Sequence, residues 1–198
     1  TTVYQGCSEA FAAVTPEDVV VARQALNLPE RYILFVGSIE ERKNLALIVE
    51  ALAQLQDKDI HLVAVGRKTP YVNTVVDSAR RLGVLSRLHL MHGVGSAMLP
   101  GIYAGAKVFV YPSRFEGFGI PLIEALNAGV PVIGATGSCL EEAGGPSSLY
   151  TDPSDATMLA SMIDRVLIDI SLRQKMITDG REYVERFTPK RLARDLSA

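Results

Sequence analysis

The chain has 198 residues, of which 48% are hydrophobic and 21% charged, with a formal net charge of −2. These values are ordinary for a globular protein with one good core and leave little room for two full α/β domains. The small net charge gives no support for a nucleic acid partner, and no apolar run reaches the ~18 residues of a membrane-spanning helix. Cys7 and Cys139 are isolated, so a reducing cytoplasm is the expected location.

Residues 1–30 are predicted to form an interdomain linker and a first helix. Thr1–Phe11 is expected to be extended, with a bend at Gly6. Thr15-Pro-Glu-Asp is typical of a helix start, because Thr can cap free amides and Pro suits the first turn; the helix is predicted to end at Leu26. The sequence begins with neither Met nor a signal-peptide pattern, so it is expected to start within a longer protein.

Strand and helix patterns alternate from residue 31 onward. Buried strands are predicted over Arg31–Gly37, Ile60–Gly66, Leu88–Met91, Ala106–Tyr111 and Val130–Ile133. Helices are predicted over Asn44–Leu55, Thr69–Leu82, Ala97–Ala104, Pro121–Ala128 and around residues 154–168 and 171–185, with a Gly- and Ser-rich loop after Ile133. This alternation predicts an α/β fold: a Rossmann-like parallel sheet with helices on both faces, over residues 31–198.

Two carboxylates, Glu116 and Glu124, follow the strand that ends at Tyr111. Ligands of open α/β sheets bind at the carboxyl ends of strands, so a site is predicted here. Glu124 is expected in the first turn of a helix, where the helix dipole alone could also explain a carboxylate. Glu116 lies in a glycine-flanked loop, where the alternative is an exposed loop charge.

A second candidate element, Gly37-Ser-Ile-Glu-Glu-Arg-Lys-Asn44, links a predicted strand to a helix. A Gly-bearing turn lets backbone amides approach a phosphate, and a helix N-terminus adds partial positive charge. Arg42 and Lys43 would supply the full charges that a diphosphate needs, and a solvated loop is the alternative. Gly66-Arg67-Lys68 is a similar strand end with two cations.

The stretch Glu116-Gly-Phe-Gly-Ile-Pro-Leu-Ile-Glu124 resembles the Glu-x7-Glu motif of retaining, GT-B-fold glycosyltransferases of the GT4 type, also called group 1. Ser138–Gly145, Tyr150–Pro153 and Glu185–Thr188 are similar to later stretches of that family, with Pro189 in place of a Trp. The resemblance covers nearly the whole chain but only the C-terminal half of such an enzyme, which binds the nucleotide sugar. It implies one half of a GT-B fold, without the N-terminal half that completes the catalytic enzyme.

The resemblance also implies an activity. Enzymes of this family transfer a hexose from a GDP- or UDP-sugar to an acceptor hydroxyl with retention, most commonly in bacterial polysaccharide or glycolipid synthesis, and mannosyl transfer is one option. The acceptor glycan or lipid-linked sugar would be held by the missing N-terminal domain, which would also carry any contact with the inner face of the membrane. No nucleic acid partner is expected.

Roles carry over to the residues that match the family motifs. Lys43 falls on the lysine that grips the diphosphate, Ser38 occupies the place of the family arginine, and Arg42 is the candidate to replace that charge. Glu116 would lie beside the reacting sugar carbon and stabilise developing positive charge, and Glu124 would accept hydrogen bonds from the ribose. The other implied contacts to the nucleotide sugar are Gly37, Gly66, Arg67, Val94, Gly117, Phe118, Gly119 and Ile120.

No metal or cofactor is expected, since the nucleotide sugar is itself the substrate. Gly93-x-Gly95 lacks the third glycine of a dinucleotide fingerprint, and Asp57-x-Asp59 is predicted to be a turn. His61, His89 and His92 have no carboxylate or Cys at ligand spacing.

Three other functions compete with that of a glycosyltransferase. The alternative that stays open is a non-catalytic nucleotide-sugar-binding subunit that acts with a partner chain. The missing dinucleotide fingerprint disfavours a nucleotide-dependent oxidoreductase, and a glycoside hydrolase would have no use for Lys43. Fold resemblance does not fix the sugar or the base.

Overall fold

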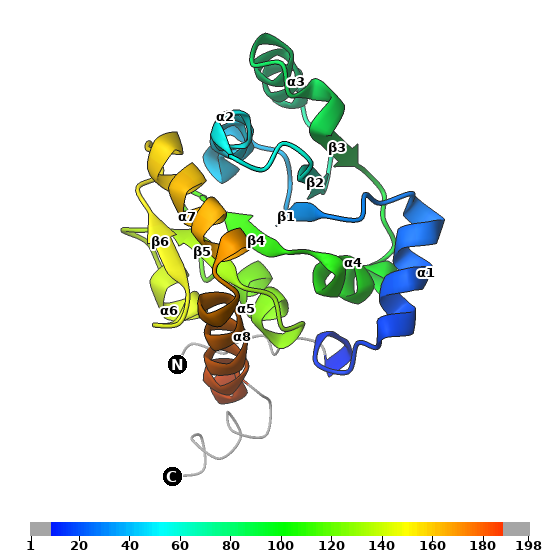
Figure 1. Cartoon of the computed structure of the whole chain (residues 1–198), viewed down its shortest axis with the longest axis vertical. Helices are drawn as coiled ribbons and strands as arrows, with labels where there is room; N and C mark the ends of the chain where they lie inside the picture. The colour runs from blue at the N-terminus through cyan, green and yellow to red at the C-terminus, as the bar shows by residue number, and fades with distance from the viewer. Residues whose placement is uncertain (1–8, 188–198) are drawn as a thin grey trace.

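The computed structural model describes residues 9–187. One six-stranded sheet has the strand order β3-β2-β1-β4-β5-β6, and every neighbouring pair is parallel (Figure 1). The strands are β1 (Tyr32–Val36), β2 (His61–Val65), β3 (Leu88–Met91), β4 (Val108–Tyr111), β5 (Val132–Ala135) and β6 (Leu149–Thr151). The order reverses between β1 and β4, as in doubly wound sheets. The predicted α/β fold is confirmed.

Helices cover both faces of the sheet, as predicted (Figure 1). On one face α2 (Leu45–Gln54) packs between α3 (Val72–Arg81) and α7 (Ala156–Ile168). On the other, α4 (Leu99–Gly105) packs between α1 (Pro16–Leu26) and α5 (Ile120–Asn127), and α5 also contacts α6 (Leu140–Gly144) and α8 (Ile170–Val184). The central strands are thereby enclosed, which explains their continuous apolar sequences.

The centre of the core lies on β1 and β4. Ile33 and Leu34 of β1 pair with Val108 and Phe109 of β4, and all four side chains are fully buried. Tyr32 can lie in this core because its hydroxyl donates a hydrogen bond to the carbonyl of Ile102 in α4, at 2.6 Å. The two central strands are therefore fixed in place by their pairing, by packing on both faces and by this hydrogen bond.

Helix α1 begins as predicted. The Asp18 amide donates to the Thr15 hydroxyl oxygen at 3.2 Å, and the Thr15 amide donates to the Asp18 carboxylate at 2.8 Å, which forms a capping box. The helix packs closely on α4, where a Cβ atom on Gly101 would lie 2.5 Å from the Asp18 carbonyl oxygen. The predicted division of the chain at residue 30 stays a prediction.

Two predicted conformations were wrong. Glu9–Phe11, predicted to be extended, forms a 3-10 helix that places the buried Phe11 ring edge-on against Tyr103, with centroids 5.3 Å apart. The Gly- and Ser-rich loop after Ile133 contains the short helix α6. Thr1–Ser8, including Cys7 and the bend at Gly6, lie outside the described residues, as do Thr188 and Pro189.

Two predicted boundaries also moved. β5 starts at Val132 and not at Val130, because Pro131 has no amide proton for the strand ladder; its carbonyl accepts from the Phe109 amide at 2.8 Å. The helix predicted over residues 97–104 divides into a 3-10 turn at Ser96–Met98 and helix α4. Within residues 9–187, no helix is long and apolar enough to cross a membrane.

Candidate functional site

The loops that follow β1 and β4 meet at the point where the strand order reverses. The Arg114 amide donates to the Arg42 carbonyl at 2.8 Å, and the Ser113 hydroxyl oxygen lies 3.2 Å from the same carbonyl oxygen. The buried Asn44 side chain donates to the Pro112 carbonyl at 3.1 Å. The predicted phosphate-binding element, from Gly37 to Asn44, is thus tied to the loop that carries Glu116. This is the place where open α/β sheets bind their ligands.

Lys43 and Glu116 form a nearly buried ion pair where these two loops meet, a junction called the crevice below because it lies outside the carboxyl ends of the strands. Each side chain is 10% exposed, and the Lys43 Nζ atom contacts Glu116 Oε1 directly. The Tyr111 hydroxyl donates to the same carboxylate oxygen at 3.0 Å, and the Ser113 hydroxyl does so at 2.7 Å. Lys43 also lies 2.5 Å from the Tyr111 hydroxyl oxygen. Glu116 is therefore a held carboxylate and not an exposed loop charge.

Arg42 completes the group of residues predicted to be catalytic. Its NH1 donates to the Phe115 carbonyl at 3.0 Å and lies 3.5 Å from Glu116 Oε1. Its Nε pairs with Glu40 at 3.1 Å, and about half of the side chain, 48%, is exposed. Arg42 is therefore open to solvent at this junction, whereas Lys43 is nearly buried.

The two strand-end glycines touch each other. A Cβ atom on Gly66 would lie 1.8 Å from the Gly37 carbonyl oxygen, so only glycine fits. The Gly37 amide donates to the Val65 carbonyl at 2.9 Å, and the Ile39 amide donates to the Arg67 carbonyl at 3.1 Å. The glycines thus bring the loops after β1 and β2 side by side, a structural reason for Gly66 that the sequence interpretation had missed.

The loop from Gly117 to Ile120 leads into α5. A Cβ atom on Gly117 would meet nothing within 4 Å, so its backbone lies in open space. Gly119 has a φ of +103°, and a side chain there would lie 2.9 Å from Leu140 of α6. The Phe118 ring packs edge-on against Phe187, with centroids 5.6 Å apart. The proposed backbone contacts of this loop to a nucleotide sugar stay predictions.

The loop after β3 lies beside the loop after β2, because His92 Nδ1 is 2.7 Å from the Gly66 carbonyl oxygen. Val94, predicted to contact the base, is partly buried against the core. Ser38 is partly exposed beside Glu40, and Arg67 is mostly exposed. The predicted site residues thus come from four neighbouring strand ends.

The position of Glu124 corrects one prediction. Helix α5 begins at Ile120, so Glu124 lies in the second turn and not the first. Its carboxylate accepts a hydrogen bond from the Tyr103 hydroxyl at 2.8 Å. Burial raises the pKa of Glu124, and the Tyr103 hydrogen bond opposes this effect only in part. The helix dipole therefore does not explain this residue, whose charge is desolvated.

Substituting Glu124 with glutamine is expected to raise stability at neutral pH. A carboxyl whose folded pKa lies above its unfolded value, about 4.3 for Glu, stabilises the fold at low pH and loses that contribution as pH rises through the folded pKa. Glutamine removes the buried charge and can still accept from Tyr103. Urea unfolding at pH 7.5 should show a gain that disappears at pH 4, whereas Glu50→Gln, on the exposed face of α2, should show neither. An equal loss at both pH values would contradict this expectation.

Sequence reasoning missed several residues that shape the site. Tyr111 and Ser113 precede Glu116 by only a few positions at the end of a predicted strand. Two hydroxyl groups so close to Glu116 in sequence could have indicated hydrogen bonds to its carboxylate. Glu40 lay within the predicted phosphate element but was assigned no role. Tyr103 comes from α4, and nothing in the sequence marks its contact with Glu124.

The Asp and His side chains that were not expected from the sequence to bind a metal ion make contacts within the fold. The Asp59 amide donates to the Asp57 side chain at 3.0 Å, and Asp57 pairs with Arg31 at 2.6 Å, so the predicted turn is confirmed. His61 Nδ1 and His89 Nε2 lie 2.8 Å apart on adjacent strands. Within residues 9–187, no three His, Cys, Asp or Glu side chains are grouped to hold a metal ion.

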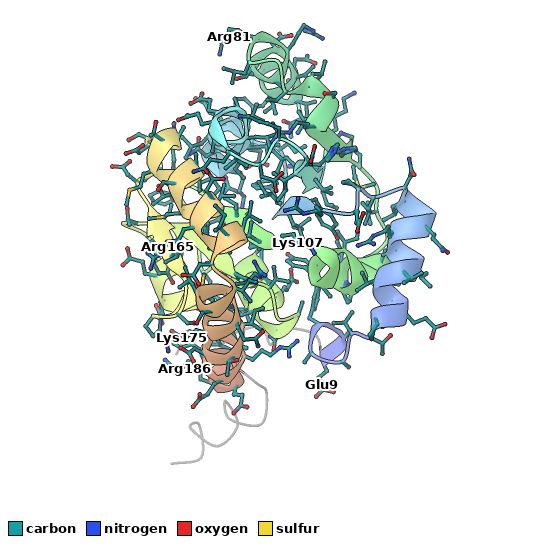
Figure 2. All side chains as sticks on the ribbon, in the orientation of Figure 1. Glu9, Arg81, Lys107, Arg165, Lys175 and Arg186 are labelled. Carbon is teal, nitrogen blue, oxygen red and sulfur yellow. The ribbon has the colours of Figure 1, made fainter. Side chains whose placement is uncertain are left out.

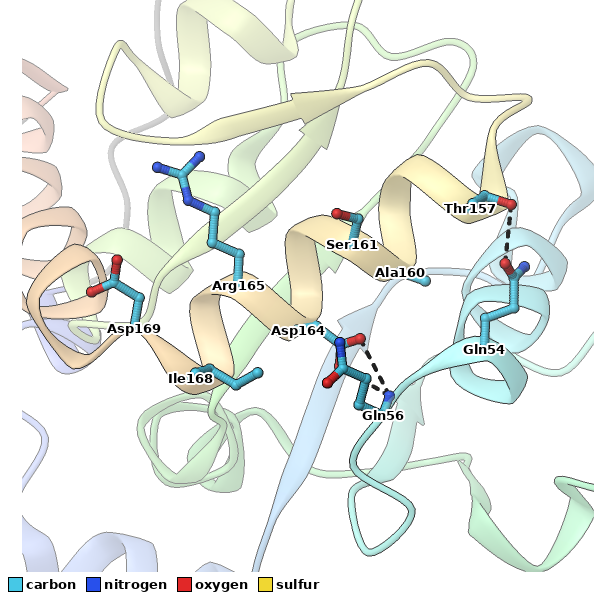
Figure 3. A pocket seen from close by; sticks show the side chains of 9 residues that line it. All are labelled: Gln54, Gln56, Thr157, Ala160, Ser161, Asp164, Arg165, Ile168 and Asp169. Carbon is cyan, nitrogen blue, oxygen red and sulfur yellow. Dashed lines mark hydrogen bonds between the residues drawn. The ribbon is translucent and has the colours of Figure 1, made fainter.

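A cavity of about 460 Å³ lies away from this crevice, between the end of α2 and α7 (Figure 3). Its polar groups mostly pair with one another: Asp164 accepts from the Gln56 amide at 3.2 Å, and Thr157 donates to Gln54 at 3.0 Å.

The charged side chains labelled in Figure 2 are all exposed, in contrast to Lys43: Glu9, Arg81, Lys107, Arg165, Lys175 and Arg186. The convergence of Arg42 and Lys43 on Glu116 thus favours the crevice over this cavity.

Residues 18–183 match the sequence profile of the family described as Glycosyl transferases group 1. The chain belongs to this family. It is 29% identical over 189 residues to O-antigen chain mannosyltransferase B of Escherichia coli, covering 92% of this chain and 49% of that protein. It is 26% identical over 191 residues to D-inositol 3-phosphate glycosyltransferase of Corynebacterium diphtheriae, covering 91% and 45%.

Solved glycosyltransferases share the fold. Alr3699/HepE of Anabaena, in complex with UDP and glucose, superposes with a TM-score of 0.86 at 21% identity, covering 100% of this chain and 56% of that one. Sucrose-phosphate synthase of Thermosynechococcus elongatus gives 0.83 at 28% identity, covering 100% and 51%. The predicted resemblance to the C-terminal domain of a GT-B glycosyltransferase is confirmed, and the chain spans about half the length of these relatives.

Proposed function

We propose that this glycosyltransferase domain binds a GDP- or UDP-sugar and serves transfer of its hexose, with retention, to an acceptor hydroxyl. The observation that carries this proposal is the meeting of Lys43 and Glu116 where the strand order reverses between β1 and β4. A cation suited to a diphosphate and a carboxylate suited to the reacting sugar thereby share one crevice. Binding there would position the anomeric carbon beside the acceptor, which replaces a bimolecular encounter.

Lys43 would stabilise the departing nucleoside diphosphate. Its ammonium group is nearly buried, so its interaction with an anion is weakly screened by water. Arg42 would add a planar fork of N–H donors at the exposed side of the crevice. The departing charge would be stabilised by these cations and by backbone amides, with no metal ion required in this proposal.

Glu116 would act on the sugar. Lys43, Tyr111 and Ser113 all contact the same carboxylate oxygen, Oε1, so the other oxygen is the one offered to the substrate. A negative charge held beside the anomeric carbon stabilises the positive charge that develops as the bond to phosphate breaks. The held geometry adds preorganisation, because the carboxylate needs little rearrangement during reaction.

The acceptor side belongs to the proposal for the whole protein. In relatives about twice as long, a further half accompanies the part that this chain matches. We propose that this half holds an acceptor glycan or lipid-linked sugar of polysaccharide or glycolipid synthesis, at the cytoplasmic face of the membrane. One relative is named for mannosyl transfer and one solved neighbour holds UDP and glucose, so both bases are to be tested.

Calorimetric titration of the chain with GDP, UDP and NAD tests the proposal. One nucleoside diphosphate is expected to bind, and both Lys43→Ala and Glu124→Ala should lose that binding, the first through the diphosphate and the second through the ribose. NAD should not bind. Binding of NAD, indifference to both substitutions, or no binding of either diphosphate at millimolar concentration would contradict the site.

A further inference from the structure

Glu40 links two arginines that come from different strand ends. Its Oε2 lies 3.1 Å from Arg42 Nε, in the loop after β1, and its Oε1 lies 3.1 Å from Arg67 NH2, in the loop after β2. Each carboxylate oxygen therefore holds one guanidinium group. Ser38, at the position of the family arginine, lies in the same loop as Glu40.

We propose that Glu40 is a positioning residue that holds Arg67 beside Arg42, so that the two guanidinium groups form one phosphate-binding pair. This pair would supply the charge that Ser38 lacks. The inference rests on the proposed function, because it assumes that a nucleoside diphosphate binds at this edge of the sheet.

The backbone supports this arrangement. The Ile39 amide donates to the Arg67 carbonyl at 3.1 Å, and Gly66 packs against Gly37, so the two loops are already adjacent. The Arg67 side chain is 75% exposed, and Glu40 is what draws its end toward Arg42. Holding such a long side chain in place before the ligand arrives reduces the entropy lost on binding.

Arg42 does not depend on Glu40 in the same way. Its NH1 also donates to the Phe115 carbonyl at 3.0 Å and lies 3.5 Å from the Glu116 carboxylate. Loss of the Glu40 carboxylate should therefore release Arg67 and leave Arg42 largely in place. The effect of Glu40 on ligand binding should pass through Arg67.

The negative charge of Glu40 also favours its role in holding Arg67 beside Arg42. Two guanidinium groups side by side repel, and a carboxylate between them offsets that repulsion. A hydrogen bond from the Ser38 side chain is the largest influence that lowers the pKa of Glu40, and Arg42 and Arg67 lower it further. Glu40 is therefore ionised at neutral pH, and it uses one nitrogen of each guanidinium, while each Arg has several N–H donors for a phosphate.

Titration of GDP and UDP into four variants tests the proposal: Arg67→Ala, Glu40→Ala, the double variant, and Lys107→Ala as the control. Arg67→Ala should weaken binding of the preferred nucleotide about tenfold, as expected for a charge-assisted contact to phosphate. Glu40→Ala should weaken it about two- to fivefold, in line with exposed ion pairs. The double variant should bind as Arg67→Ala does, because Glu40 acts through Arg67. Lys107→Ala removes an exposed cation beside the start of β1, at the opposite edge of the sheet, and should bind as the wild type.

Opposite results overturn the inference. Tighter binding by Glu40→Ala would show that the carboxylate competes with the phosphate, and additive effects in the double variant would show that Glu40 and Arg67 act independently. Unchanged melting temperatures exclude a loss of folding. If Lys43→Ala loses binding while Arg67→Ala does not, this inference fails and the proposed function stands; if the wild type binds neither nucleotide, both fail.

Discussion

Glu116→Gln in the two-half enzyme proposed above is expected to lower the rate of sugar transfer by about 100-fold or more. Glutamine keeps the shape of the side chain but removes the negative charge beside the reacting carbon. Nucleotide affinity should be unchanged or tighter, because the substitution also releases Lys43 from its ion pair. Initial rates with a saturating nucleotide sugar, together with calorimetric titration of the nucleoside diphosphate, separate the two effects.

Glu50→Gln is the matched control, because this substitution makes the same change of charge at an exposed position on α2. Its transfer rate should equal that of the wild type. A Glu116→Gln enzyme with a normal rate would remove Glu116 from the reaction. A Glu116→Gln enzyme that also fails to bind the nucleotide would assign Glu116 to binding instead.

Gly66→Ala is expected to destabilise the fold by about 3 kcal/mol or more, at the high end for a single substitution. The new Cβ atom would lie 1.8 Å from the Gly37 carbonyl oxygen, and this obstacle is backbone, which cannot rotate away as a side chain can. Either β1 or β2 would have to shift at its carboxyl end. Urea unfolding followed by far-UV circular dichroism measures the loss.

Gly95→Ala provides the control for this substitution. A Cβ atom there would meet nothing within 4 Å, and its φ of −65° suits alanine. Its stability should match that of the wild type within about 0.5 kcal/mol. A Gly66→Ala variant as stable as Gly95→Ala would show that the two glycines do not hold the loops together.

Much of the fold could be predicted because the sheet is buried on both faces. β1 and β4 appear in the sequence as unbroken apolar runs, and β2 does so after His61. The alternation of these strands with helices then favours a parallel sheet. The short helix α6 was missed because Gly137 and Gly145 flank it and Gly144 ends it, a composition typical of a loop. The helix has only five residues, too few to show a helical pattern in the sequence.

The candidate site was predictable only in outline. Lys43 and Glu116 could each be placed at a strand end. They are 73 residues apart in sequence, and their contact depends on β1 and β4 being neighbours in the sheet. The hydrogen bond from Tyr103 to Glu124 also joins residues of different elements, and the ion pair of Glu40 with Arg67 joins the loops after β1 and β2. Such contacts are set by tertiary packing, which local patterns do not encode.

The most direct test of the site is to map where a nucleoside diphosphate binds on the isotopically labelled chain. Amide chemical shifts during titration with GDP and UDP should change at Gly37, Ser38, Gly117 and Gly119, around the Lys43–Glu116 pair. Gln56 and Ser161, which line the cavity between α2 and α7, should not respond. Shifts confined to that cavity, with the crevice loops unaffected, would contradict a nucleotide-sugar site where the strand order reverses.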